Sequence, residues 1–252
     1  MSIEIRNVTV QFGGVTALLD ATLTLEPGRI ISVIGPNGSG KSTMFNAITG
    51  MVTPTSGTVI VDGVTADNLS PSQRISLGLA RTFQTPRFDP KITVEEAVLC
   101  GFYPVRKSGV LSSMLRLPNC AAEEKHFLAR CHEILSDLDL LALKDMQMGE
   151  LPMGRVRLVE VARAVANEPR YILLDEPAAG LSLDEQRMLA NEIRRLAARG
   201  VGVLLVEHNF KLVRNLAEYL MVLKQGACLI EGEPDHVASD PAFIEAYLGR
   251  TA

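Results

Sequence analysis

The chain has 252 residues, 47% of them hydrophobic, and carries a formal net charge of −4. A chain of this length and apolar content can bury a sizeable core, as one large domain or as a core with an inserted subdomain, and its slightly acidic charge offers no basic surface for nucleic acid. The longest apolar runs, such as residues 201–206, are far shorter than the ~20 residues that cross a bilayer, and no signal-peptide pattern opens the chain.

The first two elements are predicted to form an antiparallel pair. Residues 2–12 and 17–25 alternate apolar and polar side chains, and Gly13 and Gly14 mark the turn between them. Phe12 is placed at the tip of this pair. An aromatic ring there could stack on a nucleotide base or belong to the core of an edge strand, and its position alone leaves both interpretations open.

A glycine-rich loop follows this pair. Residues 35–42 fit the pattern G-x-x-x-x-G-K-[ST], between a short β-branched run at 29–34 and a helical stretch at 44–50 that ends in a glycine. In this setting the glycines let successive backbone N–H groups curl around phosphates, and the helix adds the positive end of its dipole. The loop therefore predicts a site for a nucleoside triphosphate; the alternative is a glycine-rich turn with a chance lysine.

Two side chains of this loop have specific expected roles. Lys41 is expected to reach the β- and γ-phosphates, and the Ser42 hydroxyl is expected to ligate Mg²⁺. The residues expected to hold the nucleotide are Gly35, Pro36, Asn37, Gly38, Ser39, Gly40, Lys41, Ser42 and Thr43.

Beyond the loop, residues 56–63 predict a strand and 71–77 a short helix. The next strand, at 79–83, delivers Gln84 at its end, and Pro86 follows. A polar amide just past a strand end is well placed to orient a water or a metal ion, although glutamine is also an ordinary loop residue.

From residue 92 to residue 166 the periodicity becomes helical. Thr93 is expected to cap a first helix, residues 121–138 to form an amphipathic helix, and 156–166 to form another, with an irregular or short-helical stretch at 101–119. This pattern predicts a compact helical subdomain inserted into an α/β core. The expected buried side of the second helix consists of Phe127, Leu128, Cys131, Ile134, Leu135 and Leu138.

The four cysteines show no C-x-x-C spacing, so they are interpreted as reduced, packed thiols of a cytosolic protein. They are Cys100, Cys120, Cys131 and Cys228.

The α/β pattern returns after residue 170. The apolar run 171–174 ends in Asp175 and Glu176. A buried parallel strand places its last residues at the carboxyl edge of the sheet, beside the phosphate loop. There Asp175 can hold Mg²⁺ through a water and Glu176 can polarise an attacking water, whereas the alternative is the plain N-terminus of a helix.

A second buried strand, at 202–206, follows a helix at 183–198 and ends in Glu207 and His208. His208 thus has the same strand-end position as Asp175, which predicts a contact with the γ-phosphate; the alternative is a structural histidine. The rest of the chain predicts a helix at 210–217, a hairpin of 219–224 and 227–231, and short C-terminal helices.

The order of these motifs resembles the nucleotide-binding subunits of ABC transporters over essentially the whole chain. The glycine loop is similar to their Walker A motif, and residues 171–176 are similar to Walker B with its catalytic glutamate. Gln84 is similar to the Q-loop glutamine, His208 to the switch histidine and Phe12 to the base-stacking aromatic. The resemblance implies ATP and Mg²⁺ as cofactors, and two such domains that close head to tail around two ATP molecules.

The same resemblance implies the fold. It is an α/β P-loop ATPase core with an antiparallel β subdomain and an inserted α-helical subdomain. Residues 1–86 and 167–252 would form the core and the β subdomain, and residues 87–166 the helical subdomain with the signature segment.

Finer features narrow the family. Residues 80–84 (ARTFQ), 175–181 (DEPAAGL) and 206–208 (VEH) resemble the G-type ATPase of branched-chain amino-acid importers. The ATPases of urea and short-amide uptake and of lipopolysaccharide export share part of this pattern, so the solute stays open. The resemblance implies two membrane-spanning permease subunits, an external binding protein, and a peripheral position at the cytoplasmic face of the cell membrane.

The signature segment departs from the family pattern L-S-G-G-Q. It consists of Leu151, Pro152, Met153, Gly154 and Arg155. Pro152 offers neither a hydroxyl nor an N–H, and Met153 adds bulk where a bare backbone should approach a phosphate. Arg155 can restore positive charge but not that geometry, and Ser182 stands where many relatives carry Asp.

These departures predict an asymmetric heterodimer with a second ABC ATPase subunit whose signature is intact; the alternative is a harmless variation. Two other function classes remain alternatives. A non-transport ABC ATPase is expected to have a long coiled-coil insert or tandem ATPase domains, and this chain has neither. A regulatory module that keeps ATP without hydrolysis is not expected to carry Glu176 and His208.

Overall fold

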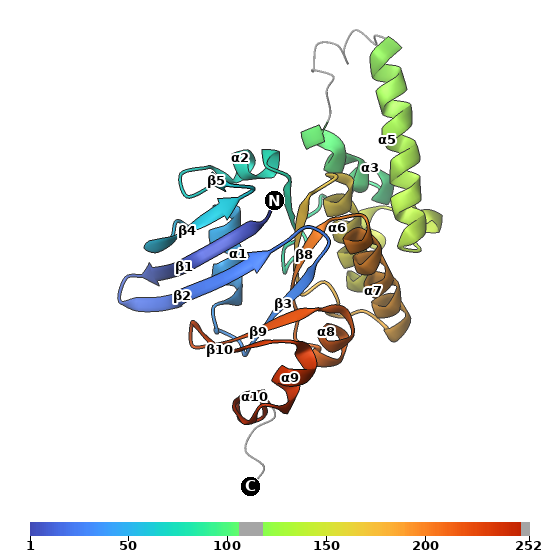
Figure 1. Cartoon of the computed structure of the whole chain (residues 1–252). Helices are drawn as coiled ribbons and strands as arrows, with labels where there is room; N and C mark the ends of the chain where they lie inside the picture. The colour runs from blue at the N-terminus through green and yellow to red at the C-terminus, as the bar shows by residue number, and fades with distance from the viewer. Residues whose placement is uncertain (106–117, 248–252) are drawn as a thin grey trace. The chain divides into compact units, whose positions relative to one another are not determined.

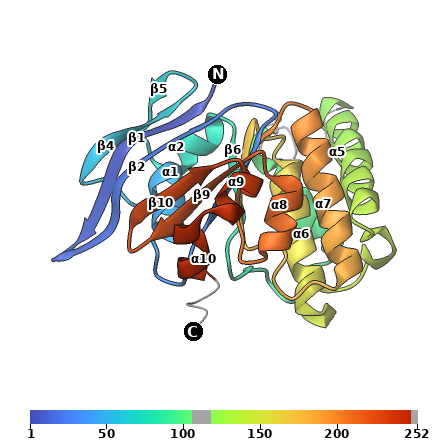
Figure 2. The same cartoon turned by 60° about the horizontal axis from the view of Figure 1, so that its bottom comes forward.

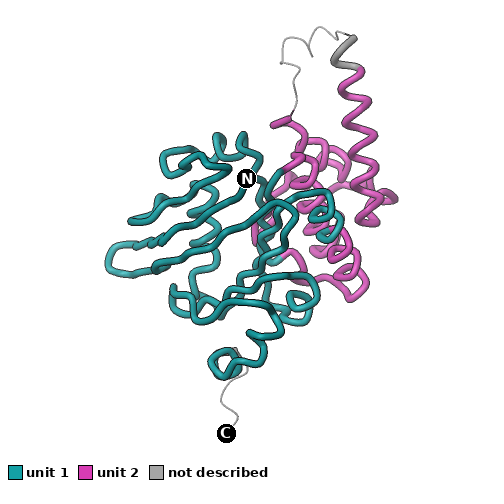
Figure 3. Tube along the Cα trace, viewed as in Figure 1, with its two compact units in different colours: residues 1–81, 170–176, 193–252 teal, residues 82–169, 177–192 magenta. Residues whose placement is uncertain are grey.

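The computed structural model describes residues 1–105 and 118–247 (Figure 1). The chain divides into two compact units, which Figure 3 distinguishes by colour. Unit 1 comprises residues 1–81, 170–176 and 193–252, and unit 2 comprises residues 82–169 and 177–192. Helix α7 (Leu183–Ala198) begins in unit 2 and ends in unit 1.

Unit 1 contains a four-stranded antiparallel sheet with the strand order β2-β1-β4-β5. Burial alternates along much of β1 and β2, so one face of the sheet contributes to the core. The strands are β1 (Ile3–Phe12), β2 (Val15–Leu25), β4 (Ser56–Val61) and β5 (Val64–Thr65).

The second sheet of unit 1 has six strands in the order β10-β9-β3-β8-β7-β6. The pairs from β9 through β6 are parallel, and β10 pairs antiparallel with β9. Every residue of β3, β7 and β8 is buried, as in a parallel sheet that is covered on both faces. The strands are β3 (Ile30–Ile34), β6 (Leu79–Arg81), β7 (Tyr171–Asp175), β8 (Gly202–Val206), β9 (Tyr219–Lys224) and β10 (Ala227–Gly232).

Helix α1 (Lys41–Thr49) contributes to a core that both sheets share. Met44, Phe45 and Ile48 of this helix are fully buried in one apolar cluster with residues of β1, β3 and β7. Figure 2 shows α1 beside β2 of the four-stranded sheet, which it contacts. The other helices of unit 1 are α2 (Pro71–Ser76), α8 (Phe210–Leu216), α9 (Pro234–Ser239) and α10 (Pro241–Tyr247).

A buried arginine completes the C-terminal end of α1. The Arg74 side chain is 1% exposed, and its Nη1 donates hydrogen bonds to the carbonyl oxygens of Ala47 (2.7 Å) and Ile48 (2.8 Å). Its Nε donates to the carbonyl oxygen of Leu69 at 3.2 Å. The last carbonyls of a helix have no partner within the helix, so this guanidinium satisfies the Ile48 carbonyl and adds a second donor to the Ala47 carbonyl, which also accepts the Gly50 N–H at 3.4 Å.

Replacing Arg74 by Met is expected to lower the free energy of unfolding by about 2–4 kcal/mol, because the buried carbonyls lose a charged donor. Denaturant titration of the full chain measures this change. Arg187→Met is the matched control, since the Arg187 side chain is 77% exposed and pairs only on the surface with Asp184; its effect should stay within about 0.5 kcal/mol. Equal midpoints for the two variants would contradict the assignment.

Unit 2 is helical within the residues described. Helices α3 and α5 both contact α6. Thr93 caps α3 with a reciprocal capping box, since its Oγ1 accepts from the Glu96 N–H and its own N–H donates to Glu96 Oε2. The α-helices are α3 (Val94–Leu99), α5 (Pro118–Asp137) and α6 (Met153–Ala166), and three short 3-10 helices lie at Cys100–Val105, Leu141–Leu143 and Met148–Glu150.

The α/β fold predicted from the sequence is confirmed, with two details corrected. Leu128 was expected on the buried side of α5, but its side chain is 38% exposed. Cys100 and Cys228 were expected to be packed and are exposed, whereas Cys131 is buried, which raises its pKa to about 12. Of the irregular stretch predicted at 101–119, residues 106–117 lie outside the described residues, as does the side chain of Cys120.

Candidate functional site

The glycine loop leaves the carboxyl end of β3 and enters α1, as its sequence predicts. Lys41 is buried, and its Nζ donates hydrogen bonds to the carbonyl oxygens of Gly35 (2.8 Å) and Pro36 (2.9 Å). These two hydrogen bonds join the end of the loop to its beginning and stabilise its curved conformation. Pro36, Asn37 and Gly38 are exposed at the rim.

Two of the loop glycines are sterically required. A Cβ at Gly35 would lie 2.2 Å from the carbonyl oxygen of Leu223, and a Cβ at Gly40 would lie 2.7 Å from that of Ala17. Gly40 also has φ +106°, which L side chains rarely adopt. A Cβ at Gly38 would meet nothing within 4 Å among the described residues, so the open side of the loop lies there.

The residues of this loop fit a polyphosphate. The N-cap of helix α1 is Gly40, which provides no side-chain cap, and the first turn has no acidic residue, so nothing in this helix compensates the positive end of its dipole. The hydroxyl of Ser39 is buried and has no hydrogen-bond partner among the described residues. A phosphate oxygen would satisfy both features.

The two carboxylates predicted at the end of β7 lie within electrostatic range of this loop. Burial lowers the pKa of Lys41, and the charges of Glu176 and Asp175 partly oppose that effect. Burial raises the pKa of Asp175, against the influence of Arg81 and Lys41. The loop lysine and both strand-end carboxylates are thus one charge cluster at the carboxyl edge of the parallel sheet.

Glu176 and His208 are in direct contact, although 32 positions separate them in the sequence. His208 Nε2 and Glu176 Oε1 are 2.7 Å apart. The Glu176 N–H donates to the carbonyl oxygen of Val206, which joins the ends of β7 and β8. Glu176 has φ +49°, a conformation that is uncommon for a residue with a side chain and is often found at functional sites.

The structure also shows an ion pair that the sequence did not predict. Arg81, the last residue of β6, places Nη2 3.3 Å from Asp175 Oδ2. The two residues are 94 positions apart, so no local spacing indicates the pair.

Phe12 lies at the tip of the β1–β2 hairpin, opposite Val15, and is 52% exposed. The same hairpin approaches the phosphate loop, because the Ala17 carbonyl lies against Gly40. An exposed ring on this hairpin is available to a ligand. Stacking on a nucleotide base stays a prediction.

A metal ion would find few protein ligands here. No group of three His, Cys, Asp or Glu side chains arranged to hold a metal occurs among the described residues. Magnesium commonly keeps waters and binds one or two carboxylates together with phosphates, so it needs no such group. The exposed hydroxyl of Ser42 and the carboxylate of Asp175 fit that pattern.

Gln84 belongs to unit 2, and its side chain is exposed. The backbone beside it is anchored to α6: the Phe83 N–H donates to Glu160 Oε1 at 2.8 Å, and Glu160 is buried. Arg163, one turn further along α6, lies over the Phe88 ring at 4.4 Å from its centroid. The segment around Gln84 is therefore tied to the helix that begins at the signature segment.

The signature segment forms the start of α6. Pro152 is the N-cap and makes no side-chain capping bond, and the Met153 side chain is 60% exposed. Arg155 is engaged within unit 2: its Nε lies 3.0 Å from Glu185 Oε1, and its Nη1 donates to the Asp139 carbonyl at 2.9 Å.

Glu185 links this segment to the start of α7. It accepts the Ser182 N–H at 2.8 Å, and that bond, aided by the nearby charge of Arg155, lowers the pKa of Glu185. Ser182 in turn accepts the Glu185 N–H through its hydroxyl. The charge of Arg155 is therefore already balanced inside its own chain.

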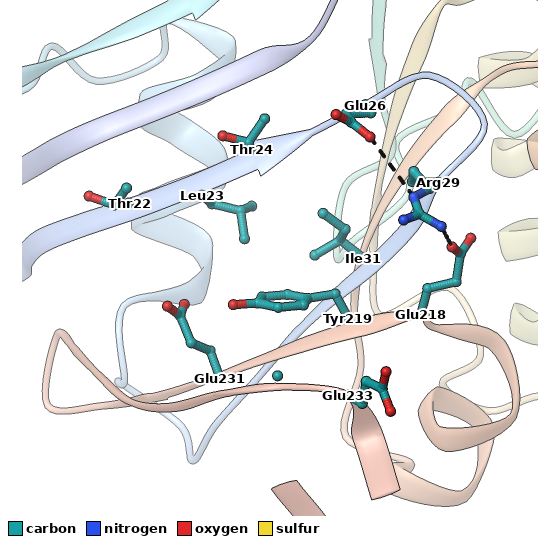
Figure 4. Close-up of a pocket in the computed structure, with 11 residues that line it drawn as sticks. Thr22, Leu23, Thr24, Glu26, Arg29, Ile31, Glu218, Tyr219, Glu231 and Glu233 are labelled. Atoms are coloured by element: carbon teal, nitrogen blue, oxygen red, sulfur yellow. Dashed lines mark hydrogen bonds and ion pairs between the residues drawn. The ribbon is translucent and has the colours of Figure 1, made fainter. Parts of the chain in front are cut away.

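Unit 1 also contains a cavity of about 720 Å³, which is lined by none of the phosphate-loop residues (Figure 4). It is lined by the ends of β2 and β10 and by the beginnings of β3 and β9, so it lies at the edge of the parallel sheet opposite the phosphate loop. Its lining includes Arg29, which is ion-paired with Glu218 and lies 4.0 Å from Glu26. Two further glutamates, Glu231 and Glu233, make the lining acidic, which does not suit a polyphosphate.

Among the described residues, no helix has both the length and the apolar character that crossing a membrane requires.

Known proteins that are similar to this chain are ATP-binding proteins, as the phosphate loop leads one to expect. The family model for ABC transporters matches residues 18–179. The chain is 35% identical over 248 residues to the high-affinity branched-chain amino acid transport ATP-binding protein LivG of Escherichia coli K12, and 34% identical over 248 residues to BraF of Pseudomonas aeruginosa, which bears the same description. Each alignment covers 98% of this chain and 97% of the relative.

A solved structure is similar over the same span. The ADP conformation of an ATP-binding cassette from an ABC transporter has a TM-score of 0.84 and 33% identity, and the match covers 99% of this chain and 100% of that one. The chain therefore belongs to the ABC transporter family, as one of its ATP-binding and ATP-hydrolysing subunits.

Proposed function

We propose that this ATPase binds Mg·ATP on the loop Gly35–Thr43 and hydrolyses it with Glu176 as the residue that polarises the attacking water. The supporting observation is the charge cluster of Lys41, Asp175 and Glu176 at the end of β7, with His208 in contact with Glu176. Ser42, Gln84 and Asp175 would hold the metal, which when bound neutralises charge on the β- and γ-phosphates.

Each of these residues has a task that its surroundings suit. The buried ammonium of Lys41 can exchange its two carbonyl partners for phosphate oxygens, which are stronger acceptors because they are charged. His208 holds the Glu176 carboxylate in one orientation and can contact the γ-phosphate. Glu176 and His208 both lie just past the ends of parallel strands, where ligands bind in open α/β sheets.

Replacing Lys41 by Met is expected to weaken ATP binding about 10- to 100-fold, the equivalent of one charge-assisted hydrogen bond. Titration with a fluorescent ATP analogue measures the affinity. Lys224→Met is the control, because Lys224 is an exposed lysine at the end of β9. If Lys41→Met bound the analogue as tightly as the control, the loop would not be the nucleotide site.

We propose further that the ATPase powers an importer of branched-chain amino acids or of related small polar solutes. The support is the similarity, over nearly the whole chain, to two proteins named for branched-chain amino acid transport. The ATPases of urea or amide uptake and of lipopolysaccharide export stay alternatives for the solute. A non-transport ABC ATPase is the alternative of another class.

The expected partners are a second ABC ATPase subunit, two membrane-spanning permeases and an external binding protein, with the chain peripheral at the cytoplasmic face of the membrane. Purification of the tagged chain from detergent-solubilised membranes of its own source tests this assignment. Permeases and a different ATPase in stoichiometric amounts support it. Recovery of the chain from the soluble fraction alone would contradict it.

The organisation expected of the chain is one ABC ATPase domain, with residues 87–166 as the helical subdomain that carries the signature. Within this domain the signature segment favours an asymmetric heterodimer. Pro152 lacks an N–H, the Met153 side chain projects into solvent, and Arg155 is held by Glu185 and Asp139. The site that this segment completes on a partner would hold ATP but turn it over slowly.

A further inference from the structure

Arg81 joins the helix that begins at the phosphate loop to the strand that ends at Asp175. Its Nη1 donates to Asn46 Oδ1 at 2.7 Å and to Thr49 Oγ1 at 3.2 Å, and both acceptors belong to α1. Its Nη2 lies 3.3 Å from Asp175 Oδ2. The guanidinium carbon is 5.5 Å from the centroid of the Phe45 ring, which also belongs to α1.

The position of this guanidinium is strongly determined. The side chain of Arg81 is 9% exposed and that of Asp175 is 4% exposed, so neither charge is screened much by water. A buried carboxylate without a partner is costly, and a planar guanidinium with donors on two sides can serve two elements at once. Arg81 uses one amino group for α1 and the other for the carboxylate.

Arg81 connects α1 and β7, the two elements that carry residues proposed to bind the nucleotide and its metal. Helix α1 begins with Lys41 and Ser42, and β7 ends with Asp175. Ser42 and Asp175 are among the residues that would hold a metal bound with the nucleotide, so an error in the orientation of the Asp175 carboxylate would weaken the binding of that metal.

We propose that Arg81 is a positioning residue that orients the Asp175 carboxylate for the divalent metal bound with the nucleotide, without touching the nucleotide itself. The proposal rests on the proposed role of Asp175 at the metal. It differs from a purely structural ion pair in one respect. A structural pair supports folding alone, whereas a positioning residue affects nucleotide binding only when the metal takes part.

The main test uses the full chain with Arg81→Met, which keeps an unbranched side chain beside the Phe45 ring and removes the guanidinium. Mn²⁺ binding in the presence of saturating ADP is measured by electron paramagnetic resonance, and ADP affinity is measured separately in EDTA. We expect Mn²⁺ affinity to fall about tenfold or more, in the range typical of residues that orient metal ligands. ADP affinity in EDTA should not change. Unchanged or tighter Mn²⁺ binding overturns the proposal, and so does an equal loss of ADP affinity in EDTA.

A second pair of variants keeps the test decisive if Arg81→Met does not fold. Asn46→Ala releases the guanidinium from its shortest contact with α1 and leaves both charges in place. Its Mn²⁺ affinity should fall by a smaller factor, and no change overturns the proposal. Arg81→Lys should restore part of the affinity lost in Arg81→Met, because an ammonium can pair with Asp175 but cannot span both elements.

Two controls separate this inference from the proposed function. Arg29→Met removes an ion-paired arginine at the opposite edge of the same sheet and should alter neither measurement. Asp175→Asn should itself lower Mn²⁺ affinity. If Asp175→Asn has no effect, the metal role of Asp175 fails; if Asp175→Asn weakens Mn²⁺ binding and Arg81→Met does not, only the role of Arg81 fails.

Discussion

Replacement of Glu176 by Gln is expected to lower ATP turnover by about 10²–10⁴-fold, the usual contribution of a general base, while ATP binding is retained. The amide has nearly the volume of the carboxylate and can keep a hydrogen bond to His208, but it cannot accept a proton from water. Phosphate release under single-turnover conditions measures the chemical step, and equilibrium titration with a fluorescent ATP analogue measures binding.

This substitution should not alter the backbone strain at position 176. Glu176 has φ +49°, and Gln is neither more nor less suited to that region than Glu, so a loss of turnover reports chemistry and not strain. Asp184→Asn is the matched control, because it neutralises an exposed carboxylate at the start of α7. Similar turnover in both variants would remove Glu176 from the mechanism, and another group would then have to polarise the attacking water.

The strands that end at the site were predictable from the sequence for a simple reason. The runs 171–174 and 202–206 are continuously apolar, and a strand buried on both faces of a parallel sheet has that pattern. The glycine loop was equally predictable, because Gly35 and Gly40 satisfy steric demands that other residues cannot meet. The rule that parallel strands end at one edge also placed Glu176 and His208 at the same edge of the sheet, but their direct contact became visible only in the structure.

What the sequence did not predict depends on contacts between distant residues. The pairing of Arg81 with Asp175 joins positions 94 apart, and Glu160, a buried acid within the apolar side of α6, accepts the Phe83 N–H from another segment. Leu128 has the helical spacing of a core residue, yet it lines an open cavity with Phe102. Periodicity reports which face of a helix is apolar; it does not report which neighbour covers that face.

Arg155 illustrates the same limit at the signature segment. In the sequence it is a positive charge at the end of the segment that resembles the signature, which suggested that it could restore some of the positive charge there. The structure pairs it with Glu185 and with the carbonyl of Asp139. Because Glu185 also accepts the Ser182 N–H, releasing Arg155 toward a ligand would break an interaction that spans two segments.

Restoring the family pattern should convert the isolated chain into an active homodimer. In the triple variant Pro152→Ser, Met153→Gly, Arg155→Gln, we expect steady-state ATP turnover by the purified chain to rise about 10²-fold or more, because each donor aimed at developing charge contributes ~2.7–4 kcal/mol. Pro152→Ser supplies a hydroxyl and an N–H, and Met153→Gly removes the exposed side chain from the approaching backbone.

The stability of the variant should change little, so the comparison is a fair one. A serine N-cap adds about 1 kcal/mol to α6, which has no side-chain cap at present, and glycine in place of Met153 removes a similar amount. The Arg155–Glu185 pair is partly exposed, at 23% and 16% of the two side chains, so its loss contributes modestly.

Two further measurements locate the cause of the gain. Arg155→Gln alone breaks the pair with Glu185 but supplies no donor at position 152, so it should leave turnover near that of the unmodified chain. Adding Glu176→Gln to the triple variant should trap an ATP-dependent dimer on size-exclusion chromatography, whereas the unmodified chain with Glu176→Gln should elute as a monomer. If the unmodified chain alone turned over ATP as fast as the triple variant, the signature would be functional as it stands, and a second, different ATPase subunit would not be needed to complete the site.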